Sequence, residues 1–187
     1  AAKKLDKTVM GELPVLTLER AQFQTSIRSD ASNRTPLGVD AVEFTAATNP
    51  GAAFTAIQKT ASGGELSRFL LALKVALAND NPLPTLVFDE VDAGVGGATA
   101  EAVGKRLQRL AENVQVLVIT HSPQVAAKGA DHLRVAKSEA GKGQMKTTVT
   151  PLDDNERRLE VARMLAGDTV TPEAEAAAAA LLGGGEV

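Results

Sequence analysis

Two short, almost uninterrupted apolar segments bracket one amphipathic segment, and this arrangement constrains the fold more than any other feature of the chain. The apolar segments cover 85–88 and 114–120, and apolar residues recur at helical spacing across 98–112 between them. Uninterrupted apolar strands are typical of parallel sheets whose two faces are both covered. A helix that joins two parallel strands makes a right-handed crossover. We therefore predict an α/β fold with a mainly parallel sheet flanked by helices.

Weaker patterns predict the elements on either side of this unit. Two helix starts are marked by capping residues, because Asp153 precedes Glu156 by three positions and Thr171 precedes Pro172. Two extended segments surround a Gly-Lys-Gly turn and are expected to pair as a β-hairpin near the C-terminus. The predicted elements are a helix over 1–13, a strand over 39–48, a helix over 62–77, a hairpin of 131–138 with 144–151, a helix over 153–165 and an Ala-rich helix from 171.

The composition excludes several classes of function. None of the 187 residues is Cys, which excludes disulfides, thiolate catalysis and Cys-ligated zinc. The 20 basic and 23 acidic residues give a net charge of −3, which argues against a free-standing polycation for nucleic acid. Neither Trp nor Tyr is present, so base-stacking platforms are not expected. No apolar run approaches the roughly 18 residues of a membrane span and no secretion signal is recognisable, so we expect a cytoplasmic protein without membrane contact.

A glycine pair stands where the third predicted element begins, within the segment ASGGELSR (61–68). Backbone N–H groups at a helix start, together with the helix dipole, favour an anion there. The Ser62 hydroxyl adds a donor beside Gly63 and Gly64, so the segment suits a phosphate oxygen. An ordinary capped helix explains the same residues equally well, since Ser62 and Glu65 also match the S-x-x-E capping pattern.

Polar residues follow both buried strands, at the edge where α/β sheets bind ligands. The first strand ends in Asp89 and Glu90, and the second is followed by His121. Asp89 could face Mg²⁺ directly or through water, and Glu90 could orient and deprotonate a water for attack on phosphorus. His121 could hydrogen-bond a phosphate or the attacking water, whereas His132 lies in the predicted hairpin and is expected to be structural. A solvated strand end and a structural histidine are the simpler alternatives.

The order of these motifs is more specific than any one of them. The segment 61–68 is followed by the acidic pair at 89–90, then by the glycine-rich segment VDAGVGG (91–97), then by ITHSPQ (119–124). In this order they resemble the signature motif, the Walker B motif, the D-loop and the switch-histidine loop of the ABC-type ATPases. The resemblance covers about residues 40–165.

Within that superfamily the chain is similar to one branch, the RecN family of bacterial DNA repair proteins in the SMC-like group. The segments ASGGELSR, FDEVDAGVGG, ITHSPQVAA and VARMLAG carry this resemblance. It implies repair of DNA double-strand breaks, with ATP and Mg²⁺ as cofactors and hydrolysis driven by dimerisation of two heads. It also implies that the full-length protein associates with DNA and with the nucleoid.

The resemblance assigns roles to individual residues. Asp89 would hold Mg²⁺ through water, and the catalytic residues Glu90 and His121 would act on nucleotide held by the N-terminal lobe of the same protein. Asp92, in the D-loop, would help couple the two sites of the dimer. The signature residues that would contact the γ-phosphate held by the opposite head are Ser62, Gly63, Gly64 and Glu65.

One motif of the family is missing from the chain. No G-x-x-x-x-G-K-[ST] sequence is present, so the Walker A loop that cradles phosphates is absent. In the family that loop lies in an N-terminal lobe, which a long coiled coil separates from the C-terminal lobe. The resemblance therefore implies a C-terminal head lobe that is inactive alone, and whose partners are the Walker A lobe of the same protein and a second head. The implied parts are the end of a coiled-coil helix (1–13), a strand-rich connection (14–60), the ATPase lobe (61–170) and an Ala-rich helix with a tail (171–187).

Other interpretations stay open at this point. The chain could be a non-catalytic interaction lobe that keeps the fold for assembly, although such a lobe would not need Asp89, Glu90 and His121. It could also be the head lobe of another SMC-like chromosome protein. A transporter ATPase is a further alternative, but it would normally carry its Walker A motif on the same chain.

Overall fold

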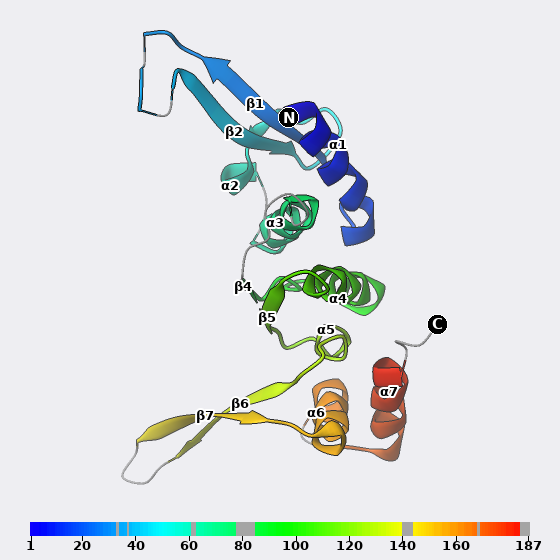
Figure 1. Cartoon of the computed structure of the whole chain (residues 1–187). Helices are drawn as coiled ribbons and strands as arrows, with labels where there is room; N and C mark the ends of the chain where they lie inside the picture. Colours follow the sequence, from blue (N-terminus) through cyan, green and yellow to red (C-terminus); the bar gives the residue numbers. More distant parts are fainter. Residues whose placement is uncertain are drawn as a thin grey trace. The chain divides into compact units, whose positions relative to one another are not determined.

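The computed structural model describes residues 1–32, 34–36, 38–60, 63–77, 85–139, 144–167 and 169–183 (Figure 1). The chain divides into two compact units, Ala1–Ile119 and Thr120–Val187. Among the described residues, the first unit holds an antiparallel sheet and a parallel strand pair with their helices, and the second holds a hairpin and helices. Ser62, at the predicted start of a helix, and the centre of the predicted hairpin lie outside the described residues.

An antiparallel sheet in the first unit packs against the first helix. Its elements are α1 (Ala2–Glu12), the 3-10 turn η1 (Pro14–Leu16), and the strands β1 (Gln22–Ser29), β2 (Asp40–Ala47) and β3 (Thr55–Ala56), in the sheet order β1-β2-β3. Oδ1 of Asp6 in α1 accepts hydrogen bonds from the backbone N–H and the hydroxyl of Thr25 in β1, at 2.9 and 2.7 Å. Val9 and Leu13 are buried. The predicted helix over 1–13 and strand over 39–48 are confirmed.

The strand–helix–strand unit forms as the periodicity predicts. The helices α2 (Ile57–Thr60) and α3 (Gly63–Leu77) precede it, and its elements are β4 (Thr85–Asp89), α4 (Gly97–Ala111) and β5 (Gln115–Ile119). β4 and β5 pair in parallel, from Thr85 opposite Gln115 to Asp89 opposite Ile119. The apolar stripe of α4 faces inward, because Val103, Leu107 and Leu110 are each at most 4% exposed.

The parallel sheet is smaller and less covered than predicted. Within the described ranges, β4–β5 is the only parallel pair, and the other strand pairings are antiparallel. Alternation along β4 buries Leu86 and Phe88, but Val87 is 57% exposed, and Leu117 and Ile119 on the same face of β5 are 47% and 48% exposed. Within this chain, one face of the strand pair is therefore covered and the other is exposed. An apolar run is compatible with two covered faces, but it does not specify what covers each one.

The second unit combines a short helix, a hairpin and two packed helices. These elements are α5 (Pro123–Ala126), β6 (Leu133–Glu139), β7 (Met145–Pro151), α6 (Asp154–Ala166) and α7 (Pro172–Gly183). β6 and β7 pair in antiparallel register, as predicted for the hairpin. α6 and α7 pack through a small core of Val161, Ala162, Ala174 and Ala178.

Capping residues begin α6 and α7 as predicted. The Asp153 carboxylate accepts from the Glu156 N–H at 2.8 Å, and the Glu156 carboxylate accepts from the Asp153 N–H at 3.1 Å. The Thr171 hydroxyl accepts from the Ala174 N–H at 3.3 Å. Across the part of the chain that the structure describes, every helix falls short of the length and hydropathy that a membrane span requires.

Candidate functional site

The acidic pair lies where the parallel strands end. Asp89 is the last residue of β4, opposite Ile119, and Glu90 follows it. The Glu90 N–H donates to the Ile119 carbonyl at 3.0 Å, which extends the parallel ladder by one residue. Both carboxylate residues are exposed. The structure thus places the pair at the carboxyl edge of β4 and β5, where the sequence predicts it.

Glu90 has a left-handed backbone conformation, with φ at 46°. This conformation costs a non-glycine residue roughly 1–2 kcal/mol, because Cβ comes too close to the following carbonyl oxygen. The turn after Glu90 holds it in place, since the Ala93 N–H donates to the Glu90 carbonyl at 2.9 Å. Strained residues of this kind cluster at functional sites. Among the described residues, Thr17 is the other non-glycine residue with a left-handed backbone, and of the two only Glu90 also stands in a predicted site motif.

The loop 91–96 turns into the unit directly after Glu90. Val91 and Asp92 are each 1% exposed, so one apolar and one acidic side chain anchor the loop. The Val95 N–H donates to the Asp92 carbonyl at 3.2 Å. Gly94 has φ at 75°, which a residue without Cβ adopts at no steric cost. Asp92, the predicted coupling residue, therefore lies inside its own unit.

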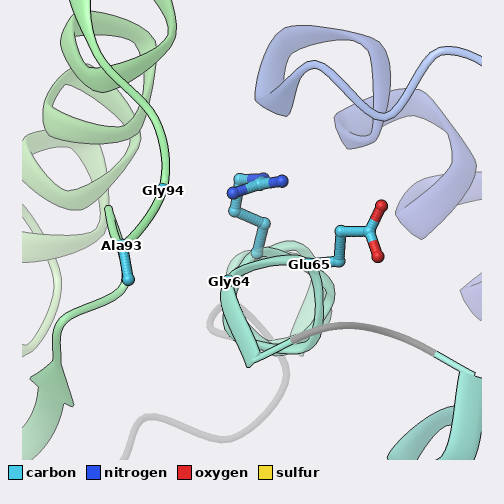
Figure 2. Close-up of a pocket in the computed structure, with 5 residues that line it drawn as sticks. Gly64, Glu65, Ala93 and Gly94 are labelled. Carbon is cyan, nitrogen blue, oxygen red and sulfur yellow. The ribbon is translucent and has the colours of Figure 1, made fainter.

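The start of α3 packs against this loop through backbone atoms (Figure 2). A Cβ atom on Gly64 would collide with the carbonyl oxygen of Ala93, whereas one on Gly63 would meet no atom of the described residues within 4 Å. The structure thus brings together two of the predicted motifs, although they are far apart in the sequence. An open hollow of about 370 Å³ lies at the contact and is lined by Gly64, Glu65, Arg68, Ala93 and Gly94.

Arg68 belongs to this hollow, and the sequence patterns alone do not single it out. The residue is 7% exposed, and its Nε atom has no hydrogen-bond partner among the described residues. Burial lowers the pKa of the Arg68 guanidinium, and the nearby Glu65 carboxylate opposes this shift. Its spacing from Gly64 could have revealed it, because residues four apart share one face of a helix. The hollow therefore combines a helix N-terminus with a buried cation, an arrangement that favours an anionic group.

More than half of the chain matches a known protein family. The RecF/RecN/SMC N-terminal domain family matches residues 15–144. The chain belongs to the RecF/RecN/SMC family. The predicted resemblance to its RecN members is confirmed, because proteins named DNA repair protein RecN are 45% identical in Vibrio cholerae and 44% identical in Rickettsia bellii. These alignments cover 97% of the chain but 32% and 33% of the relatives, so the chain spans about a third of their length.

Solved SMC head domains share the fold of this family member. An SMC head domain with a coiled coil from Pyrococcus yayanosii has a TM-score of 0.63 at 20% identity, over 85% of this chain and 28% of that chain. A chain from a study of ATP-driven dimerization and DNA-stimulated activation of SMC ATPases has a TM-score of 0.57 at 18% identity, over 89% of this chain and 94% of its own. At these identities the similarity shows the fold alone. The predicted α/β fold of an SMC-type head is confirmed at that level.

The predicted switch histidine of this family member belongs to the second unit. His121 is exposed and follows the end of β5 by two residues. Ser122, directly after it, is the N-cap residue of α5. The Ser122 N–H donates to the Thr120 hydroxyl at 2.9 Å, which ties the backbone together across His121.

Asp89 ends β4 with an exposed carboxylate, an oxygen donor of the kind that binds Mg²⁺ in proteins. In the described ranges, no group of three or more His, Cys, Asp or Glu side chains forms a metal site by itself. Mg²⁺ usually binds through one or two protein carboxylates when nucleotide phosphates supply further oxygens. The carboxylate at the end of β4 fits that pattern in the presence of nucleotide.

The other histidine, His132, lies close to charged residues of α6. Burial lowers the pKa of His132 below its ordinary value of 6.5, the Arg157 charge lowers it further, and Glu160 opposes both effects. Glu160 itself is 7% exposed, and its pKa is lowered mainly by hydrogen bonds from Arg163 at 2.7 and 3.0 Å. Both residues therefore hold their protons less tightly in the folded state than in the unfolded state.

These two pKa shifts predict how the stability of the second unit depends on pH. Because the unfolded chain binds more protons at both sites, the free energy of unfolding should fall as the pH drops below the ordinary pKa of His132 at 6.5, and fall again below that of Glu160 at 4.5. Denaturant unfolding of the 187-residue chain across this pH range measures the effect. His132→Gln should flatten the first decrease, and an unchanged slope in this variant would contradict the assignment.

Proposed function

We propose that this chain is the C-terminal ATPase-head lobe of a RecN-like protein that repairs DNA double-strand breaks. Joined to a lobe with a Walker A loop and paired with a second head, it hydrolyses ATP. The observation that carries the proposal is the contact between the start of α3 and the loop 91–96, because that loop begins at the strained Glu90. The RecN relatives and the SMC heads support the same conclusion. The full-length protein binds DNA and works in the cytoplasm, at the nucleoid.

Asp89, Glu90 and His121, which are all exposed, are the proposed catalytic set. Glu90 deprotonates the water that attacks the γ-phosphate, and its exposed carboxylate is accessible to that water. His121 holds the γ-phosphate or the attacking water by a hydrogen bond. Asp89 holds Mg²⁺ through a water molecule. When bound, Mg²⁺ neutralises the negative charge that develops on the phosphate oxygens.

The start of α3 is the proposed contact to ATP held by the opposite head. Gly63 is exposed, and a Cβ there would meet no atom of the described residues within 4 Å, so those residues leave room for a phosphate. The helix dipole favours an anion at this end. Asp92, which is buried in the loop between Glu90 and Ala93, would help couple the two nucleotide sites of the dimer. The proposed signature residues are Ser62, Gly63, Gly64 and Glu65.

The open face of β4–β5 supports the proposal of a second lobe. Val87, Leu117 and Ile119 expose a contiguous apolar surface there, and such surfaces commonly mark interfaces. We propose that the Walker A lobe of the same protein covers this face. The proposed parts of the chain are the end of a coiled-coil helix (1–13), a strand-rich connection (14–60), the ATPase lobe (61–170) and a C-terminal helix with its tail (171–187).

The proposed division into lobes makes a direct prediction about activity. The 187-residue chain alone should release no phosphate from ATP above background, because the phosphate-cradling loop is not part of it. Addition of the purified Walker A lobe of the same protein should produce turnover, measured as phosphate release. Robust turnover by the chain alone would contradict the proposal. Co-elution of the two lobes without turnover would indicate a non-catalytic interaction lobe instead.

A further inference from the structure

One side chain of α6 binds three backbone carbonyls in the segment that follows α5. The Nη1 atom of Arg157 donates to the Ala130 carbonyl at 3.0 Å. Its Nη2 atom donates to the carbonyls of Ala127 at 3.1 Å and Gly129 at 2.5 Å. Hydrogen bonds from a charged donor are stronger than those between neutral groups. Arg157 therefore clamps the 127–130 segment to α6.

The clamped segment closes the same short helix that begins directly after His121. The carbonyls of Ser122 and Pro123 accept from the amides of Ala126 and Ala127 at 3.0 and 2.9 Å, so α5 is a single turn between His121 and the clamp. A helix this short is marginal by itself, because helix nucleation is costly. Its persistence depends on contacts at its ends.

The helix that carries Arg157 is itself held firmly. A capping box of Asp153 and Glu156 begins α6, and the core that it shares with α7 includes the fully buried Val161 and Ala162. The apolar core and the cap thus fix the backbone of α6, and Arg157 transfers that rigidity to α5. Arg158, the next residue, is exposed and pairs instead with Asn155 and Glu175.

We propose that Arg157 is a positioning residue for His121. It fixes the C-terminal end of α5, and thereby the N-cap Ser122 and the backbone of the histidine before it. The planar guanidinium suits this task because it presents several donors in a rigid fork, whereas the Lys ammonium is a compact point charge. The effect of Arg157 on turnover rests on the role that the proposed function gives to His121. The hydrogen bonds between Arg157 and the 127–130 segment do not depend on that role.

Amide hydrogen exchange in the 187-residue chain tests the clamp without any nucleotide. In Arg157→Gln, the amides of Ala126, Ala127 and Lys128 should exchange about tenfold faster or more, while the amides of α6 and α7 keep their protection. The exposed neighbour supplies the matched control, because Arg158→Gln should leave α5 unchanged. Arg157→Lys, which keeps the charge, should give an intermediate increase and serves as the test variant if Arg157→Gln does not fold. Unchanged protection of α5, or an equal change in the control, would overturn the proposal.

Kinetics of the full-length protein test whether the clamp acts through His121. Arg157→Gln should lower kcat about tenfold with little change in KM for ATP, and it should cause no further loss in a His121→Ala background. Equal losses in both backgrounds would show that Arg157 does not act through the histidine. If His121→Ala alone leaves kcat unchanged, the role of His121 in the proposed function fails, and the exchange experiment still decides whether the clamp exists.

Discussion

Glu90→Gln should lower ATP turnover of the full-length protein by about 10²–10⁴-fold while ATP binding persists. The Gln side chain has nearly the same shape as the Glu side chain and should occupy the same position. Its amide group cannot accept the proton of the attacking water. Phosphate release measures turnover, and equilibrium binding of ATP measures retention of the nucleotide. Turnover within about threefold of the unsubstituted protein would show that another group serves as the base.

The left-handed backbone of Glu90 supplies the control that separates lost catalysis from lost folding. Glu90→Gly removes the Cβ atom that strains this conformation, so the free energy of unfolding of the 187-residue chain should stay equal or rise by up to about 1 kcal/mol. The same variant of the full-length protein should still lose turnover. Together these two results would show that Glu90 lowers the stability of the fold but is needed for turnover. A clear loss of stability in Glu90→Gly would contradict this explanation.

Gly64→Ala should destabilise the first unit by about 1–3 kcal/mol. The added Cβ would meet the carbonyl oxygen of Ala93, and the turn after Glu90 cannot move away without breaking the hydrogen bond from the Ala93 N–H to the Glu90 carbonyl. Gly63→Ala is the matched control, because its Cβ would meet no atom within 4 Å in the part of the chain that the structure describes. It should be neutral or slightly stabilising, since Ala favours helix more than Gly does.

Denaturant unfolding of the 187-residue chain compares the two glycine variants without nucleotide. The comparison isolates packing from any role in phosphate binding, because both glycines belong to the same proposed phosphate contact. Equal stability of Gly64→Ala and Gly63→Ala would mean that the close approach to the Ala93 carbonyl does not hold in solution. A selective loss in Gly64→Ala would confirm it.

Local patterns are sufficient to predict the elements that carry the site. The apolar runs at 85–88 and 114–120 have the length of strands, and the spacing across 98–112 admits only a helix with one buried face. Charged residues directly after an apolar run are expected at a strand end, so the sequence alone places Asp89 and Glu90 at the edge of the sheet. These inferences use residues that are neighbours along the chain.

Contacts between distant segments could not be predicted in the same way. Whether a face of β4–β5 is covered depends on the elements that pack against it. An apolar strand has the same sequence pattern whether one face or both are covered. The spacing of Arg68 from Gly64 places the two residues on one helix face, but only the folded chain shows that Arg68 lines a hollow. Arg157 resembles any surface arginine in the sequence, because its partners are backbone carbonyls, which every residue type provides.

The contact between Gly64 and Ala93 has a consequence for how this family varies through evolution. The contact requires that position 64 has no side chain. Position 93 contributes only its backbone carbonyl oxygen, which every residue type provides. We therefore expect glycine to be retained at position 64 while position 93 accepts other small residues, with no compensating exchange between the two positions. Methods that find contacts from pairs of positions changing together would not detect this one, although it joins the helix start to the loop beside the proposed catalytic carboxylate.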